Sequence, residues 1–422
     1  MLIIYEICLL IYVICYLPFI FIRGKWHHGF WERLGFISQS SKLNISGADS
    51  IWVHAVSVGE VTAIAELIKS IKKKYPDSQI VLTVSTKTGY ELAMSKFSHM
   101  ASVMWSPLDF TLSVKSFISI IKPGIYLVAE TELWPNLFSQ LHKKRIPILL
   151  INGRISDLSI KKYLRLRWFM KPYLRLMDSL CMQSQLDVER IVSMGALVEQ
   201  VKKVGNIKFD DLPDTSHKTA DQLGFNREDW IWVAGSTHPG EEDIVLEVLQ
   251  RIKSKYSRLR LVIAPRHIER SDLVFENVLS KGFSALKYSD ILTGPLKAES
   301  VVVVDKIGHL RELYSLATVV FVGKSLTVQG GHNIIEPAFF AKPVIIGPHM
   351  QNFRDVTAAF KANQAIIEVR DVDELTCAID DLLSHPQKMT DLGIKAKAVI
   401  QSQQGATQRI MNEIALFMEK RT

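Results

Sequence analysis

Short apolar runs alternate with amphipathic segments along most of this chain, and this alternation constrains its fold more than any other feature. From residue 51 onward, the apolar runs have the character of strands, and the segments between them carry hydrophobic residues at helical spacing. Strands that are apolar on both faces are typical of parallel sheets covered by helices on each side. The pattern therefore predicts an α/β fold built on parallel sheets.

The alternation occurs twice, with a polar interruption between the two parts. In the first part the predicted strands are Ile51–Val56, Ile80–Val84, Ile125–Ala129 and Pro147–Ile151. In the second part they are Trp230–Ala234, Leu259–Ile263, Val301–Val304, Val319–Val322 and Val344–Ile346. The stretch 205–228 is polar and rich in turn-forming residues, so we interpret it as an interdomain linker.

The sequence thus predicts two α/β domains of similar size with a cleft between them. A chain of 422 residues is long enough to give each domain a sizeable core. We expect the first domain over residues 23–204 and the second over 229–422, whose last helix can pack back on the first domain. Typical predicted helices are Glu241–Lys253 and Val61–Lys74, the latter with Ile64, Leu67, Ile68 and Ile71 on one face.

An apolar segment precedes both domains. Residues 2–22 contain Glu6 as their only charge, and a helix of this length spans roughly 32 Å, enough to cross a bilayer. Basic residues follow the segment, whereas a signal peptide would carry its charges first and end in a cleavage site. The positive-inside rule then places the rest of the chain in the cytoplasm, with residues 1–22 as a membrane anchor. Pro18 and Glu6 leave open a helix that lies in one leaflet.

A second segment is also suited to a membrane surface. Lys161–Leu176 carries six Lys and Arg residues interleaved with aromatic side chains, a composition that fits an anionic lipid surface. The formal net charge of +8 agrees with anionic partners. The alternative is a solvated helix face beside a core face. Nucleic acid is disfavoured because no recognised nucleic-acid module accompanies the segment.

Carboxylates follow two predicted strands of the first domain. Glu60 comes after Ser57, Val58 and Gly59, where Gly59 permits a tight turn and the start of a helix would keep Glu60 ionised and able to accept a proton. Glu130 and Glu132 follow another strand, and the carboxyl ends of parallel strands face the ligand crevice. The alternatives are a helix-capping role for Glu60 and pairing of the others with structural Arg or Lys residues.

Three crevice loops of the second domain suit a nucleotide. Gly235–Gly240 is a strand-to-helix turn rich in backbone N–H groups, and Arg266 ends the next strand. Gly330–Ala338 combines two glycines, a helix start and Glu336, which could accept both hydroxyls of a ribose. The alternative is a helix whose first turn tolerates proline.

The sequence contains no evident metal or disulfide site. Asp371 and Asp373 form the only Asp-x-Asp motif, and they precede a helical run, so we interpret them as a helix N-cap pair. The four cysteines include no Cys-x-x-Cys pair, which argues against a zinc site or a disulfide framework. Leaving-group charge would therefore be offset by Lys, Arg and helix dipoles.

These motifs resemble those of the 3-deoxy-D-manno-oct-2-ulosonic acid (Kdo) transferases of lipopolysaccharide synthesis. The matching motifs occur in the family's order across nearly the whole chain: SVGE (57–60), ETELWPN (130–136), GNIKFD (205–210), AGSTHPGEE (234–242), APRH (264–267), GGHNIIEPA (330–338) and GPHMQNF (347–353). The apolar N-terminus with GKWHHGFWERLG (24–35) also resembles the family's membrane anchor.

The resemblance implies a GT-B glycosyltransferase with two Rossmann-like domains and no cofactor or metal. It implies inverting transfer from CMP-Kdo to the tetraacylated, bis-phosphorylated lipid A precursor at the cytoplasmic face of the inner membrane. Glu60 would be the base, and Glu130 and Lys208 would stabilise the transition state. The residues that would hold CMP are Pro265, Arg266, Ile307, Gly308, His309, Asn333, Ile334, Ile335 and Glu336.

Two positions depart from the family's pattern. His309 stands where the family usually has Glu, and Lys324 replaces a glycine in the VGGS motif, here VGKS at 322–325. These departures bear on the details of the donor contacts.

Other functions fit parts of the pattern. A GT-B transferase that uses a UDP- or GDP-sugar and a nucleotide-sugar epimerase of similar fold are the enzymatic alternatives. A membrane-tethered nucleotide sensor is the non-enzymatic one, but it would not need Glu60, Glu130 and Lys208.

Overall fold

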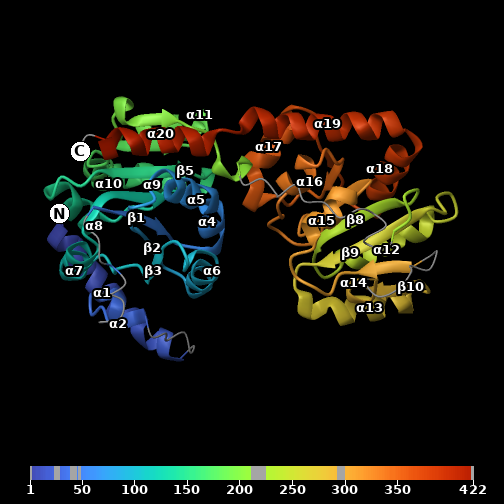
Figure 1. Cartoon of the computed structure of the whole chain (residues 1–422), viewed down its shortest axis with the longest axis horizontal. Helices are drawn as coiled ribbons and strands as arrows, with labels where there is room; N and C mark the ends of the chain where they lie inside the picture. Colours follow the sequence, from blue (N-terminus) through green and yellow to red (C-terminus); the bar gives the residue numbers. More distant parts are fainter. Residues whose placement is uncertain are drawn as a thin grey trace. The chain divides into compact units, whose positions relative to one another are not determined.

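The computed structural model of the protein describes residues 2–22, 29–38, 45, 49–210, 225–291 and 300–419. The described chain forms two compact units (Figure 1), of which unit 1 contains residues 1–211 and 404–422 and unit 2 contains 212–403. The predicted basic flank from Arg23 to His28 and linker residues 211–224 lie outside the described residues.

Unit 1 is built on a seven-stranded parallel sheet with the strand order β3-β2-β1-β4-β5-β6-β7. Its strands are β1 (Ser50–Ala55), β2 (Ile80–Val84), β3 (Ser102–Trp105), β4 (Pro123–Ala129), β5 (Ile148–Gly153), β6 (Ser179–Met182) and β7 (Val201–Lys203). The predicted parallel sheet is confirmed, and it is wider than the four strands recognised from the sequence.

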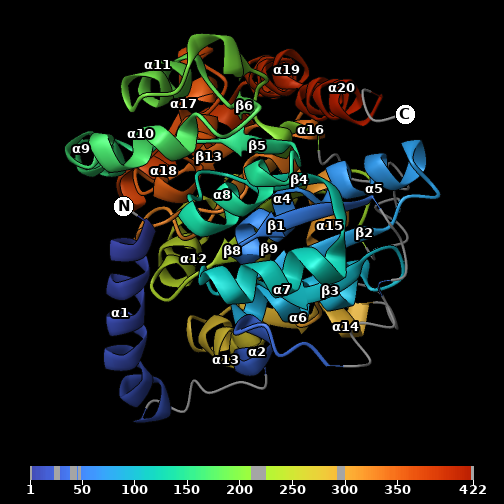
Figure 2. The same ribbon diagram turned by 90° about the vertical axis from the view of Figure 1, so that its left-hand side faces the viewer.

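Helices cover both faces of this sheet. The helices are α1 (Leu2–Ile22), α2 (Gly29–Arg33), α4 (Val58–Ala63), α5 (Ala65–Lys74), α6 (Lys87–Phe97), α7 (Thr111–Ile121), α8 (Pro135–Lys143), α9 (Asp157–Arg165), α10 (Arg167–Leu174), α11 (Gln185–Ser193) and α20 (Ala406–Met418), with the 3₁₀ turns η1 (Val198–Gln200) and η2 (Ile207–Phe209). Alternate residues of β1 enter different cores, because successive side chains of a strand point to opposite faces. Ile51 and Val53 pack with α5 and α20, whereas Trp52 packs with α7 and α8 (Figure 2).

The helix predicted over Val61–Lys74 is interrupted. It forms α4 and α5, which meet at Ile64, whose φ of −81° and ψ of 2° end the first helix. The predicted apolar face is nevertheless confirmed, because its four side chains are fully buried: Ile64, Leu67, Ile68 and Ile71.

The chain returns to unit 1 at its C-terminal helix. Asp210 accepts hydrogen bonds from the backbone N–H groups of Gly405 (2.7 Å) and Thr407 (2.6 Å), which caps the start of α20. Farther along α20, Glu413 accepts hydrogen bonds from Ser179 Oγ (3.1 Å) and Lys202 Nζ (2.7 Å). The last helix thereby belongs to the first compact unit.

The N-terminal helix α1 docks on unit 1 through its only charged residue. Glu6 Oε1 accepts a hydrogen bond from the backbone N–H of Thr111 (2.6 Å), at the start of α7. The ring of Tyr5 lies 6.0 Å from that of Phe169, between centroids. Within the part of the chain that the structure describes, no helix combines the length and the apolar character needed to span a membrane.

The predicted basic segment 161–176 forms two short helices rather than one. No residue of α9 is buried, and the side chains of Lys161, Lys162, Arg165 and Arg167 are exposed. The following helix α10 inserts Tyr173 and other apolar residues into the core.

Unit 2 repeats the architecture with a second seven-stranded parallel sheet, in the order β10-β11-β9-β8-β12-β13-β14. Its strands are β8 (Trp230–Thr237), β9 (Leu259–Pro265), β10 (Ser284–Lys287), β11 (Ser300–Val303), β12 (Val319–Val322), β13 (Val344–Ile346) and β14 (Ile367–Glu368). Its helices are α12 (Glu241–Ile252), α13 (Ser271–Ser280), α14 (Tyr288–Ile291), α15 (Leu310–Leu316), α16 (Ile335–Phe339), α17 (Arg354–Ala362), α18 (Val372–Ser384) and α19 (Pro386–Gln403), with the 3₁₀ turns η4 (Ile268–Arg270) and η5 (Gln351–Phe353). The predicted N-cap at α18 is confirmed, because the Asp371 carboxylate accepts the N–H of Glu374 at 2.9 Å.

Candidate active site

Three carboxyl groups line one small cavity of unit 1. Glu60 lies just beyond β1, and Glu130 and Glu132 follow β4, the neighbouring strand in the sheet. The cavity has a volume of about 160 Å³. The other residues that line it come from the same loop, from the end of β5 and from the start and inner side of α9: Thr131, Arg154, Ser156, Ser159 and Tyr163.

Glu60 is held in the first turn of α4 by two hydrogen bonds. Its Oε2 accepts the backbone N–H of Val56 (2.7 Å), and its Oε1 accepts the hydroxyl of Ser57 (3.2 Å). The side chain is only 8% exposed. Glu60 therefore caps the strand-to-helix turn and at the same time presents a carboxyl group to the cavity.

The turn itself is made by Ser57 rather than by Gly59. Ser57 has extended backbone angles (φ −128°, ψ 168°), and Gly59 already lies inside α4. A Cβ atom on Gly59 would meet only Ser57 Oγ, at 3.8 Å. The expectation that Gly59 provides a tight turn was wrong, because a serine in an ordinary extended conformation makes the change of direction.

The ionisation state of Glu60 differs from the expectation drawn from the sequence. Burial, together with the charges of Glu130 and Glu132, raises the pKa of Glu60 to about 7, against the lowering effect of the Val56 N–H. The prediction that the helix dipole keeps this carboxyl ionised was wrong. The six residues of α4 form a short helix, and the loss of hydration outweighs its dipole.

Glu132 shares this environment. Burial raises the pKa of the Glu132 carboxyl to about 7, and the charge of Glu130 adds to the effect. Glu130 itself has a φ of +55°, a left-handed conformation that is uncommon for a residue with a side chain. Its backbone N–H is bonded to Ile151 O (2.9 Å), which holds the loop against β5. Backbone strain of this kind concentrates at functional sites.

Lys208 lies in η2, beyond the end of β7, and it is partly exposed. Its backbone N–H donates to Asn206 Oδ1 at 3.0 Å. Lys208 is not among the residues that line the acidic cavity. Its predicted role in stabilising charge therefore remains a prediction.

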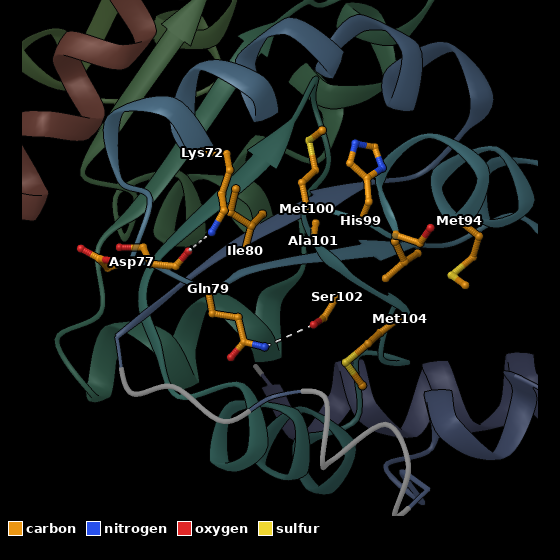
Figure 3. A pocket seen from close by; sticks show the side chains of 13 residues that line it. Lys72, Asp77, Gln79, Ile80, Met94, His99, Met100, Ala101, Ser102 and Met104 are labelled. Atoms are coloured by element: carbon orange, nitrogen blue, oxygen red, sulfur yellow. Dashed lines mark hydrogen bonds between the residues drawn. The ribbon is translucent and has the colours of Figure 1, made fainter.

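A larger cavity of about 660 Å³ lies at the opposite edge of the same sheet, where β2 and β3 begin. Gln79 Nε2 donates to Ser102 Oγ (3.2 Å) among the residues that line it (Figure 3). Lys72 Nζ donates to the carbonyl of Pro76 (2.6 Å). We place the chemistry in the smaller cavity because ligands of open parallel sheets bind at the carboxyl ends of the strands.

In unit 2, the structure brings several predicted nucleotide contacts together at the carboxyl edge. Glu336 Oε1 lies 3.3 Å from Arg311 Nε and accepts a hydrogen bond from Asn333 Nδ2 (3.3 Å). His309 Nδ1 lies 3.4 Å from a carboxylate oxygen of Glu312, on the same helix as Arg311. This arrangement fixes the Glu336 carboxylate while leaving it partly exposed.

The remaining residues predicted to contact CMP differ in their exposure. Arg266 is exposed directly after Pro265, the last residue of β9, and Ile307 is 84% exposed beside Gly308. Ile334 and Ile335 are buried in the core, so a ligand could meet these two residues only through the backbone.

One N–H group of the Gly235–Gly240 turn is already bound to a carboxylate of the protein. Glu241 accepts the backbone N–H of His238 (2.9 Å), which belongs to the turn, and those of Lys324 (2.8 Å), Ser325 and Leu326, which follow β12. The His238 N–H is therefore not available to a phosphate. Phosphate binding by the rest of the turn stays a prediction.

The two glycines of the Gly330–Ala338 loop are needed for the packing of the protein itself, and the predicted approach of a ligand to them stays a prediction. Gly330 and Gly331 have φ values of +137° and +71°. A Cβ on Gly330 would lie 2.9 Å from Lys324 Cε, and one on Gly331 would overlap the side chain of Met350. Glycine therefore allows close packing against the protein's own side chains.

Sequence reasoning missed several residues of these two sites. Arg154 was not singled out although it follows β5, and the same carboxyl-end rule would have found it. Ser159 was not singled out either, and Tyr163 was interpreted only as part of the basic segment 161–176. Arg311 belongs to none of the motifs recognised in the sequence. Its contact with Glu336 depends on the packing of α15 against α16, which the sequence does not reveal.

The two parallel α/β units, each with polar loops at its carboxyl edge, define a protein with the GT-B-like fold. Solved structures share the fold at low sequence identity. A UDP-GlcNAc 2-epimerase from Neisseria meningitidis bound to UDP-GlcNAc has a TM-score of 0.57 at 13% identity, covering 86% of this chain and 99% of that one. A further UDP-N-acetylglucosamine 2-epimerase has a TM-score of 0.59 at 12% identity, covering 89% and 98%.

Sequence relatives identify the family within this class. Residues 28–211 match the family described as 3-deoxy-D-manno-octulosonic-acid transferase (kdotransferase). The 3-deoxy-D-manno-octulosonic acid transferase of Haemophilus influenzae is 31% identical over 97% of this chain and 96% of its own length. A bifunctional glycosyltransferase/methyltransferase of Fusobacterium nucleatum is 35% identical over 80% of this chain, which spans about half (53%) of that relative. The chain belongs to the Kdo transferase family, and it is a glycosyltransferase, as its motifs predicted.

The raised pKa of Glu60 predicts how stability depends on pH. A carboxyl whose folded-state pKa is raised stabilises the fold below its ordinary pKa of 4.5, and this contribution is lost as the pH rises toward 7. Glu60→Gln should therefore gain stability relative to the unchanged protein between pH 4.5 and pH 8, by on the order of 2–3 kcal/mol. Chemical unfolding at both pH values measures this. Glu91→Gln, on the exposed side of α6, is the control. The assignment would be contradicted if the stability of Glu60→Gln relative to the unchanged protein were as independent of pH as that of Glu91→Gln.

Proposed function

We propose that this protein transfers Kdo from CMP-Kdo to the tetraacylated, bis-phosphorylated lipid A precursor. The observation that carries the proposal is the cavity of unit 1, in which the buried Glu60 carboxyl has a pKa of about 7. A general base works best when its pKa lies near the working pH, because it is then both available and basic enough to take a proton. Family membership supports Kdo as the transferred sugar.

The proposed reaction is a single displacement. Glu60 takes the proton of an acceptor sugar hydroxyl while that oxygen attacks the anomeric carbon of Kdo. The bond from the anomeric carbon to the phosphate oxygen breaks, and CMP leaves with the bonding electrons. Attack on the side opposite the leaving group inverts the anomeric centre. We assign Glu130 and Lys208 to the stabilisation of charge in the transition state.

The donor is proposed to bind at the carboxyl edge of unit 2. Glu336, oriented by Arg311 and Asn333, is placed to accept the ribose hydroxyls. Arg266 is the cation that we assign to the phosphate, because it is exposed at the carboxyl end of β9 and the Glu241 carboxylate already binds the His238 N–H of the neighbouring turn. His309 and the backbone of the 333–336 loop complete the predicted contacts with CMP.

Removing the base tests the proposal most simply. Glu60→Gln keeps the hydrogen-bonding reach toward the Val56 N–H but cannot accept a proton, so turnover should fall at least about a hundredfold. CMP affinity should stay nearly unchanged, because the residues assigned to CMP belong to unit 2. Steady-state kinetics and CMP calorimetry on the same variant measure both. Near-normal turnover would move the base to Glu130 or Glu132.

The nucleotide site is tested by Glu336→Ala. The loss of two charge-assisted hydrogen bonds to the ribose should weaken CMP binding by roughly 2–4 kcal/mol. Glu247→Ala, which removes an exposed carboxylate of α12, is the matched control. Calorimetry that finds equal CMP affinity in both variants would remove Glu336 from the site.

We propose that transfer requires no metal ion. A monophosphate leaving group carries less charge than a diphosphate, and Arg266 and Lys208 are assigned to offset it. Excess EDTA should therefore leave the initial rate unchanged. Loss of activity in EDTA, with recovery on addition of magnesium, would show that a metal takes part.

We further propose that the protein lies at the cytoplasmic face of the inner membrane, held by α1 and by the α9–α10 segment. Large apolar side chains of α1 are 50–73% exposed: Ile3, Ile4, Ile7, Leu10, Ile11, Tyr12 and Ile14. Trp168, on α10, is 66% exposed beside the basic residues of α9. Exposed apolar and basic side chains on neighbouring helices suit the interface of an anionic bilayer.

Vesicle binding tests this surface. After deletion of residues 1–22, the protein should remain active and still bind anionic vesicles at low salt, because each basic residue near the surface contributes about 1 kcal/mol. Replacing Lys161, Lys162, Arg165 and Arg167 by Gln should abolish that preference, whereas replacing Lys73 and Lys74 of α5 should not. Equal partitioning onto neutral and anionic vesicles would contradict the proposal.

A further inference from the structure

Lys324 occupies a backbone position that favours glycine. It follows β12 with a φ of +56°, in the left-handed region that disfavours any residue with a Cβ atom. Its backbone is fixed on both sides, because its N–H donates to Glu241 (2.8 Å) and its carbonyl accepts the N–H of Gly331 (2.6 Å). Lysine thus stands at a backbone position that glycine would adopt with less strain.

Two paired imidazoles lie close enough to Lys324 to be affected by its charge, and its carbonyl is bonded to Gly331, the residue before His332. His238 Nε2 and His332 Nε2 are 3.2 Å apart, and their rings stack with centroids 5.4 Å apart. Burial and the nearby charge of Arg266 lower the pKa of His332 to about 3, and His238, Lys324 and His267 add to the effect. Burial also lowers the pKa of His238, with Lys324, His267 and Arg270 lowering it further and Glu241 opposing them.

The acidic groups beside this cluster are already engaged. Glu241 divides its two oxygens among four backbone N–H groups, and Glu242 pairs with Arg270 at 2.9 Å. Each of the charged or titratable neighbours that act on His332 disfavours its protonation. The cluster therefore has an excess of positive charge and hydrogen-bond donors, which is the environment that an anion requires.

We propose that Lys324, His238 and His332 form a subsite for the carboxylate of the transferred sugar acid. This inference rests on the proposed function, in which the donor carries two anions, the phosphate of CMP and the carboxylate of Kdo. The planar guanidinium of Arg266 suits the phosphate. The ammonium of Lys324 and a proton on the paired imidazoles then hold the carboxylate, so that a neutral sugar would lack this attachment.

The variant Lys324→Gly separates this role from a structural one. Glycine adopts a φ of +56° freely, so the melting temperature should not fall. The KM for CMP-Kdo should rise about tenfold or more, while the inhibition constant of CMP stays within about threefold of its original value. Lys324→Arg should retain most of the donor affinity.

The chain offers a matched control in Lys122. This residue ends α7 in unit 1 with a φ of +47°, so Lys122→Gly removes the same charge from the same kind of backbone position. It should leave the KM for CMP-Kdo unchanged. An unchanged KM in Lys324→Gly, or an equal loss of CMP and CMP-Kdo affinity, would overturn the carboxylate subsite.

A second measurement does not depend on turnover. Free Kdo is added to the CMP-saturated protein, and the imidazole ¹⁵N signals of His238 and His332 are followed by NMR. Both signals should shift toward the protonated form, and Lys324→Gly should suppress the response. If the protein transfers no Kdo but shows this response, the proposed function fails and the anion subsite stands. Absence of the response in the unchanged protein would refute the subsite whatever the turnover.

Discussion

The burial of the Glu60 carboxyl group is the constraint on which the chemistry of unit 1 depends. Two opposing interactions set its basicity: the loss of hydration, with the nearby Glu130 and Glu132, raises its pKa, and the Val56 N–H lowers it. The hydrogen bond to Val56 also fixes the carboxyl at the end of β1. A more exposed Glu at this position would be a weaker base. A buried Glu without the N–H would be harder to ionise.

The rigid sheets allow strained residues to be held where ligands bind. Residues with left-handed backbones lie at or near the carboxyl ends of β4, β5, β8 and β12: Glu130, Asn152, Ser236 and Lys324. The strands behind them are almost entirely buried, as in Ile148–Gly153. Such strain persists only where the surrounding structure determines the conformation. Both units thus place unusual conformations, and the side chains that we assign to chemistry and donor binding, at the same edge of the fold.

The fold was largely predictable from local patterns, whereas the electrostatics of the site were not. Apolar runs such as Ile80–Val84 predicted buried parallel strands, because a continuous run of apolar residues can be recognised from the local sequence alone. The pKa of Glu60 could not be predicted, since it depends first on how deeply the folded chain buries the carboxyl and then on carboxyl groups some seventy residues away in the sequence. The role of Glu241 was hidden for the same reason, because its carboxylate binds the N–H groups of residues beyond β12. Motifs identified the family, but the roles of Tyr163 and Arg311 in the two sites came only from three-dimensional contacts.

The pH dependence of kcat/KM for Kdo transfer tests the central claim most directly, because this quantity reports the ionisation of essential groups in the free enzyme. The account predicts that activity falls on the acid side with an apparent pKa near 7, the value to which burial raises the pKa of Glu60. An acid limb near the ordinary carboxyl value of 4.5 would contradict it. Glu60 would then be an ordinary solvated carboxylate, and the acidic cavity of unit 1 would not be the source of the base.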